Sequence, residues 1–437
     1  MVNALPPWCW LTVTYAITTF SIRAEAWQTT IALTLLYPDN LQRISICMLV
    51  GSAASAVLCP GVGWIISRYN RQVVLCSFLV LQKICIVLLM LLLWAMSSSR
   101  LFLDEDRSSE LAFLMVVLLG TMVRVANAGT QVAIEKDMAT AIATDSDDLM
   151  SLNSSLKLVD LLGKLAIPLL VSLFAVATSN QVTLLCIAAF CFFSMFIEVY
   201  LIVHHVFSRF PSLKERQILQ AGTATVTLFT AFGTTIRNPV FLTCISMAIL
   251  YANVLSPGSI VISFLAEKGT HGSVIAGITA CAAVFGLLAT VCYSSLVRFM
   301  RIIPLGNVSL WLQTLCIGCS CVPFIIDPSF GAVSIAIFSF GIIVSRFGLW
   351  IFDLVQTQIL QESFAEDAGM AFGIQMSLQN IFELVGYGLT AYWSSPSTFE
   401  IPSFISFLLL VVSSILFSTY SILCGPSSGY TLIQSVE

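Results

Sequence analysis

Polar side chains that can bind ions or carry protons lie inside long apolar runs of this sequence. An ionisable group at the centre of a bilayer costs at least about 2.5 kcal/mol, so it is retained there for an ion pathway, a bound solute or a buried pair. We interpret most of them as parts of a site for a charged solute, and we expect Lys83, Glu198 and Lys164 to form structural ion pairs or to reach a helix end. The other polar residues in these runs are Arg23, Glu25, Gln82, Arg124, Glu135, Lys136, Asp137, Lys157, Asp160, Arg346, Asp353 and Glu383.

Three of the charged residues follow one helical stripe. Lys157, Asp160 and Lys164 are spaced i, i+3 and i+7, which places them on one face of a helix. Lipid does not solvate three charged groups. The spacing therefore predicts a face turned toward protein partners or an aqueous cavity.

A helix break falls near the centre of another apolar run, AILYANVLSPGSIVISF. Pro257 removes a backbone donor and clashes with the preceding turn, and Gly258 adds conformational freedom. Freed carbonyl groups are tolerated at membrane depth only against protein or a watery cavity. We predict that the break at Pro257 and Gly258 offers backbone oxygens to a cation; a passive kink is the alternative.

The sequence lacks the motifs of an intramembrane enzyme. Its three histidines, His204, His205 and His271, do not fall near the middle of an apolar run, and there is no HExxH motif or glycine-flanked nucleophile. The cluster Cys316, Cys319 and Cys321 lies in an apolar run without a partner pair, so we interpret it as packing. We predict no enzyme and no cofactor.

The elements that position these residues must be membrane-spanning helices. Of the 437 residues, 58% are hydrophobic and 10% are charged, against about 25% charged in soluble domains. A chain this apolar needs lipid as its solvent, and no basic run suggests a nucleic acid partner. The runs are continuous rather than alternating, which excludes a membrane β-barrel.

Windows of about 20 apolar residues predict about twelve spans. We expect an all-α polytopic membrane protein with a six-helix half over 1–206, a cytoplasmic linker over 207–237, a second six-helix half over 238–424 and a cytoplasmic tail over 425–437. The windows fall near 8–36, 41–66, 73–98, 110–141, 148–178, 181–206, 238–267, 272–297, 303–326, 330–361, 370–393 and 401–424.

Basic residues and a weak repeat support this layout. Arg68 with Arg71, the linker cluster, and Arg298 with Arg301 all fall in loops of one side, which should be cytoplasmic, as should both termini. The second span exits through SRYNR (67–71) and the eighth through VRFMR (297–301). A parallel repeat of six-helix halves is typical of major-facilitator transporters, whose sites lie near the midplane between the halves.

Longer stretches resemble the ferroportin family. They are SRFGLWIFDLVQTQILQES (345–363), VAIEKDMATAIATDSDDLMSLNSSLKLVDLLGKLAIPL (132–169) and NPVFL (238–242). The resemblance implies a monomeric plasma-membrane exporter of ferrous iron or a related divalent metal, working by alternating access with proton coupling. It also implies a cytoplasmic gate of polar residues, to which we assign Asp137, Asn153, Asp160 and Arg346.

The metal positions depart from the family pattern. Where the family carries ligands, this chain has Ile22, Ala26, Ser259 and Gly386. We predict that the remaining donors bind the metal: Glu25, Gln82 and Cys191 in the first half, with Ser259 and Glu383 in the second. Because a serine stands where vertebrate members have the cysteine that binds hepcidin, we expect no regulation by a hepcidin-type peptide.

The missing ligands leave two alternatives open. One is a transporter of a different cation. The other is a non-transporting relative that acts as a receptor or scaffold. Retention of Asp137 and Arg346 and of the helix break favours a transporter.

Overall fold

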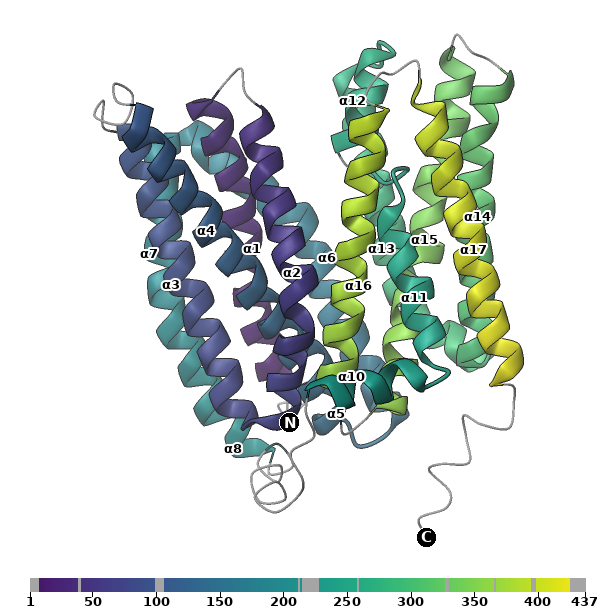
Figure 1. The fold of residues 1–437 in the computed structure, drawn as a ribbon, viewed down its shortest axis with the longest axis horizontal. Coiled ribbons are helices and arrows are strands. Elements are labelled where there is room, and N and C mark those ends of the chain that lie inside the picture. The colour runs from purple at the N-terminus through teal and green to yellow at the C-terminus, as the bar shows by residue number, and fades with distance from the viewer. Residues whose placement is uncertain are drawn as a thin grey trace, which may run out of the picture. The chain divides into compact units, whose positions relative to one another are not determined.

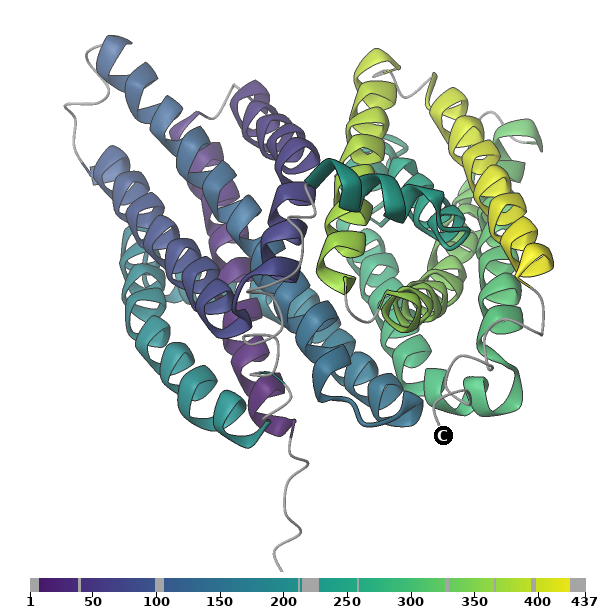
Figure 2. The same ribbon diagram turned by 60° about the horizontal axis from the view of Figure 1, so that its bottom comes forward.

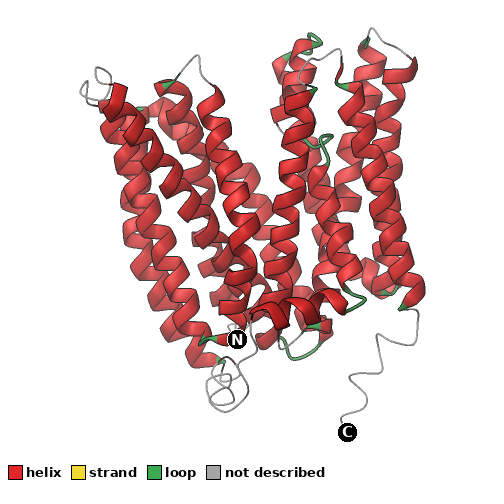
Figure 3. Cartoon of the chain, in the orientation of Figure 1, coloured by secondary structure: helices red, strands yellow, loops and turns green. Residues whose placement is uncertain are grey.

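The computed structural model describes residues 8–37, 41–98, 106–210, 213, 228–257, 259–326, 330–364, 367–393 and 398–424. This part of the chain is helical and contains no strand (Figure 3). Nine of its helices are long and apolar enough to cross a membrane. α1 (Cys9–Leu36) and α16 (Ala368–Tyr392) are as long but less apolar. The predicted all-α polytopic membrane fold is confirmed.

The chain divides into two compact units, 1–228 with 364–377, and 229–363 with 378–437. In the first unit, six long helical segments run side by side (Figure 1, purple to teal). They are α1, α2 (Leu41–Arg68), α3 (Arg71–Ser98), α4 (Asp106–Gln131) with its extension, α6 (Ser146–Ala177) and α7 (Asn180–Leu201) with its extension. α4 continues through a π-helix (Val132–Met138) into α5 (Ala139–Ile142), and α7 through a second π-helix (Ile202–Val206) into α8 (Phe207–Arg209).

The second unit contains the break that the sequence predicts. The seventh window is divided between α11 (Phe241–Ile249), followed by a 3-10 turn over Leu250–Ala252, and α12 (Ser259–Glu267). The complete helices are α13 (Gly272–Phe299), α14 (Ile302–Ile326), α15 (Ala332–Ser363) and α17 (Glu400–Leu423). The second unit also contains α16 from residue 378 onward, whereas the first turns of α16 belong to the first unit. α10 (Leu228–Arg237) lies within the segment predicted as a linker and runs crosswise to the long helices of its unit (Figure 2).

Short polar residues determine where several helices begin. The Asp145 side chain accepts a hydrogen bond from Asp148 N at 2.7 Å and starts α6. Ser179 caps α7 through Val182 N at 3.2 Å. Asn70, in the predicted SRYNR turn, accepts from Gln72 N at 2.9 Å and starts α3. Each cap satisfies an amide that the first helical turn leaves without a partner.

Apolar side chains from α1, α3, α4, α6 and α7 form the core of the first unit, with Leu89, Leu93 and Leu184 fully buried. Polar residues interrupt this core on α1, at Thr14, Thr18 and Ser21, which are buried as well. Since a buried hydroxyl requires a hydrogen-bond partner, these positions indicate that polar groups gather around this part of α1.

Candidate functional site

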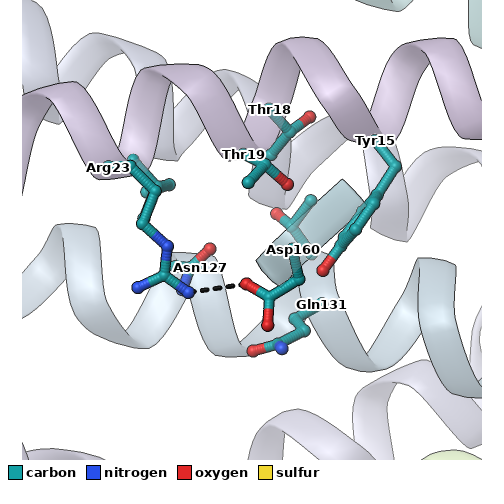
Figure 4. A pocket seen from close by; sticks show the side chains of 9 residues that line it. Tyr15, Thr18, Thr19, Arg23, Asn127, Gln131 and Asp160 are labelled. Carbon is teal, nitrogen blue, oxygen red and sulfur yellow. Dashed lines mark hydrogen bonds and ion pairs between the residues drawn. The ribbon is translucent and has the colours of Figure 1, made fainter. Parts of the chain in front are cut away.

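A small polar pocket lies in the first unit, between α1, α4 and α6 (Figure 4). Eight of its nine lining residues carry a hydroxyl, amide or charged group: Tyr15, Thr18, Thr19, Arg23, Asn127, Thr130, Gln131 and Asp160, with Ile22 as the ninth. Hydroxyl, amide and carboxylate oxygens in this number can replace the hydration shell of a small ion.

Asp160 provides the only carboxylate of this lining. Its Oδ1 accepts from Arg23 Nη2 at 2.7 Å and its Oδ2 accepts from Lys164 Nζ at 2.8 Å. Lys157, on the same helix, also acts electrostatically on Asp160. The carboxylate side chain is 4% exposed, whereas the Arg23 and Lys164 side chains are 32% and 39% exposed. Of the predicted charged stripe of α6, Asp160 therefore lines the polar pocket, and its carboxylate is paired with the Arg23 and Lys164 side chains.

Buried groups behind the lining orient the pocket side chains. Gln82 Nε2 donates to Asn127 Oδ1 at 3.4 Å, and Thr130 Oγ1 donates to Gln82 Oε1 at 3.3 Å. Tyr15 Oη donates to Glu135 in the π-helix. Because each of these bonds joins two helices, the pocket wall is held by hydrogen bonds as well as by packing.

The π-helix after α4 positions two acidic groups. Extra residues in a helical turn change the direction of the side chains, and such segments are frequent at functional sites. Glu135 accepts the Tyr15 hydroxyl, and Asp137 accepts Arg71 Nε at 2.6 Å. Asp137 is 1% exposed. Arg71 follows the Asn70 cap, so the turn between α2 and α3 delivers the counter-ion of Asp137.

The four predicted gate residues lie in different surroundings. Asp137 pairs with Arg71, Asn153 is buried on α6, and Asp160 lines the pocket. Arg346 belongs to the second unit, where its Nη2 donates to Leu255 O at 3.3 Å. Leu255 lies in the non-helical stretch between α11 and α12, so the broken helix does supply a carbonyl to a charged side chain. A gate formed by all four residues stays a prediction.

The predicted metal ligands do not line this pocket. Glu25 accepts Thr29 Oγ1 at 3.1 Å and is 7% exposed. Cys191 is fully buried and within electrostatic range of Glu25, and Gln82 lies behind the pocket wall. Within the described ranges, no three or more His, Cys, Asp or Glu side chains gather to hold a metal. The metal assignments to these three residues remain predictions.

The remaining predicted residues belong to the second half. Glu383 accepts Tyr387 Oη at 2.9 Å on α16. Pro257 ends the non-helical stretch, and Gly258 lies outside the described residues. Ser259 begins α12, and its side chain also lies outside the described part.

Sequence reasoning missed the neutral half of the pocket. Tyr15, Thr18 and Thr19 belong to the segment YAITTF, in which polar residues recur within one apolar helix. Neutral hydroxyls can bond to their own helix backbone, as Thr14 Oγ1 does to Trp10 O at 2.9 Å, so they do not require a partner in the way that a charge does. The number of hydroxyl residues in this one apolar segment was the feature from which the pocket could have been predicted.

The arrangement suits a hard or borderline cation. Oxygen donors bind such ions, whereas thiolate and imidazole select softer metals, and the pocket lining contains neither. Arg23 and Lys164 compete with any entering cation for the same carboxylate. A cation can therefore reach this carboxylate only when at least one of these two ion pairs opens.

Comparisons with known proteins bear on the family and the fold of this chain. A family model described as Ferroportin1 matches residues 7–410. Solute carrier family 40 member 1 of Oryza sativa subsp. japonica is 25% identical over 430 residues, covering 91% of this chain and 87% of the relative. A bacterial homologue of the iron transporter ferroportin, in its outward-facing state, superimposes with a TM-score of 0.85 at 21% identity, over 96% of this chain and 100% of the other.

A more distant likeness extends the comparison of folds. A proton:xylose symporter of the major facilitator superfamily superimposes with a TM-score of 0.67 at 13% identity, over 94% of this chain and 95% of the other. The predicted major-facilitator-like architecture is thereby confirmed.

Proposed function

This chain belongs to the ferroportin family and is a multi-pass membrane transporter rather than an enzyme, and from that premise we propose that it exports ferrous iron or a related divalent metal cation by alternating access. The observation that carries the proposal is the Asp160 carboxylate, buried at membrane depth and surrounded by hydroxyl and amide groups. A carboxylate in such a place marks an ion pathway.

Metal binding at Asp160 requires the Arg23 or Lys164 side chain to move away from the carboxylate. Arg23 Nη2 and Lys164 Nζ occupy both carboxylate oxygens. An entering divalent ion gains the carboxylate only when at least one of these bonds breaks. Because Arg23 lies on α1 and Asp160 on α6, occupancy by metal changes an ion pair between two helices, which couples binding to helix position.

The cellular setting follows from the family and from charge. We propose that the protein acts in the plasma membrane as a monomer, with both termini cytoplasmic because the basic loops lie on that side. With Ser259 in place of a cysteine, a hepcidin-type peptide finds no thiol there, so we propose that such a peptide does not regulate this transporter.

The test is flux of radiolabelled Fe²⁺ into proteoliposomes of purified protein, with Mn²⁺, Co²⁺ and Zn²⁺ as competitors and empty liposomes as the control. We expect saturable flux that the other divalent ions inhibit. Measuring flux from both sides of oriented vesicles gives the direction. Absence of flux of every divalent ion, from protein that unfolds cooperatively, would favour a different substrate or a non-transporting role.

The substitution Arg23→Gln tests the competition for Asp160. It removes one of the two cations bonded to this carboxylate, and we expect the apparent affinity for Mn²⁺ to rise by about tenfold, equivalent to about 1.4 kcal/mol. The measurement is the KM of Mn²⁺ flux.

Arg43→Gln is the matched control, because Arg43 pairs with Glu110 and does not line the pocket. Its KM should match that of the unmodified protein. A higher KM in Arg23→Gln would mean that Arg23 holds Asp160 in its binding position rather than competing with the metal.

A further inference from the structure

A second polar cluster lies in the first unit where α1, α3 and α7 meet. The Lys83 ammonium donates to Ser21 Oγ at 2.5 Å and to Ser194 Oγ at 3.0 Å, and it pairs with the Glu198 carboxylate. The other Glu198 oxygen accepts Thr18 Oγ1 at 2.6 Å. The Lys83 and Glu198 side chains are both 0% exposed, so the expected structural pair is confirmed.

The surroundings of the ammonium are those of a bound cation. An ammonium has three donors, and here they meet one hydroxyl oxygen from α1 and one hydroxyl and one carboxylate oxygen from α7. Hard metal cations bind oxygen donors such as these, with water completing a coordination shell of about six or more. The cluster is therefore an oxygen cage whose positive charge is supplied by a side chain.

Packing alone is a weak reason for such a pair. Removing two charges from water costs several kcal/mol per ion, and apolar residues of similar volume often stabilise a protein as well or better. The cluster also contacts the pocket, since Thr18 both lines the pocket and donates to Glu198. The Lys83–Glu198 pair is thus connected through the Thr18 hydroxyl to the lining of the Asp160 pocket.

We propose that the Lys83 ammonium is a built-in cation that fills a Glu198-based divalent-cation site of the first unit and keeps free metal ions out of it. One of the predicted metal ligands adjoins this cage, since Cys191 is within electrostatic range of Lys83 and Glu198. The inference goes beyond the proposed function because it requires binding and not transport.

The test compares two variants that both remove the charge. Lys83→Ala empties the cage, whereas Lys83→Met keeps an unbranched neutral chain of similar length in it. The probe is Mn²⁺, counted by its electron paramagnetic resonance signal in detergent-purified protein, with Ca²⁺ as a competitor. We expect Lys83→Ala to bind about one more Mn²⁺ than the unmodified protein, displaceable by Ca²⁺, and to melt about 5 °C higher with Ca²⁺ than without. Lys83→Met should gain no site.

Glu198 supplies the second control. Lys83→Ala combined with Glu198→Gln removes the only carboxylate bonded to the ammonium, so the additional Mn²⁺ should disappear. Equal Mn²⁺ binding by the unmodified protein and Lys83→Ala would overturn the proposal. If folded Lys83→Ala protein can be purified only in the presence of Ca²⁺, that dependence supports the proposed site. If folded Lys83→Ala protein cannot be purified with or without Ca²⁺, while the double variant can, the proposal is overturned. Fe²⁺ flux by the unmodified protein is measured separately, so a failed transport proposal is recognised independently.

Discussion

Replacing Asp160 by asparagine is expected to abolish divalent metal flux while the protein stays folded. The substitution keeps the size of the side chain but removes the only carboxylate of the pocket lining, leaving Arg23, Lys157 and Lys164 as an uncompensated positive group. A divalent ion then meets repulsion in place of a ligand. We expect kcat/KM for Mn²⁺ and Fe²⁺ flux to fall by at least about 100-fold, or about 2.7 kcal/mol, measured in proteoliposomes.

Two further variants make this result specific. Asp160→Glu retains the charge and should keep a measurable part of the flux. Glu25→Gln removes the carboxylate that the sequence analysis assigned to the metal; Glu25 bonds to Thr29 on its own helix and does not line the pocket. Flux within about twofold of the unmodified protein would assign the metal to the pocket, whereas loss of flux would support the predicted role of Glu25 as a ligand. Loss of flux in Glu25→Gln with normal flux in Asp160→Asn would move the site away from the pocket.

The substitution Gly348→Ala is expected to lower the stability of the protein, because it separates α14 from α15. A Cβ atom at this position would lie 2.4 Å from Ser309 O and 3.0 Å from Gln313 N, both backbone atoms of α14. Side-chain rotation cannot relieve such a contact, so the helix backbones must move apart. Overpacking of this kind costs about 1–3 kcal/mol and sometimes more. We expect the melting temperature in detergent to fall by at least about 5 °C.

Gly277→Ala is the matched control on α13. A Cβ atom there meets nothing within 4 Å, and alanine favours a helix by up to about 1 kcal/mol over glycine. Its melting temperature should be unchanged or slightly higher. Equal melting temperatures for the two variants would mean that α14 and α15 tolerate a wider separation than their contacts indicate.

Small residues explain why these two helices approach so closely. Gly341 and Gly348 are seven residues apart and lie on the same face of α15, where a Cβ at Gly341 would be 2.4 Å from Cys316 O. In lipid, helix association depends on close packing between backbones rather than on the hydrophobic effect. The same α15 carries Arg346 to the Leu255 carbonyl, so a wider separation from α14 should also disturb the contact at the helix break.

The sequence by itself determined the class of the protein and the order of its spans. Continuous apolar runs require helices, since every backbone polar group must be satisfied within the bilayer, and the predicted windows coincide with the helices to within a few residues. The break after Leu250–Ala252 was also predictable, because proline cannot donate to the helix. Family membership followed from motifs that are local in the chain.

Only the tertiary structure decided which polar groups meet. Arg23 and Glu25 are two residues apart, which is about 200° around a helix, so they face different surroundings: Arg23 bonds to Asp160 in the pocket and Glu25 to Thr29. Lys83 finds Glu198, 115 positions along the chain. Such pairings depend on how each helix is rotated against its neighbours. Packing of the apolar faces sets that rotation, and helix periodicity alone leaves it undetermined.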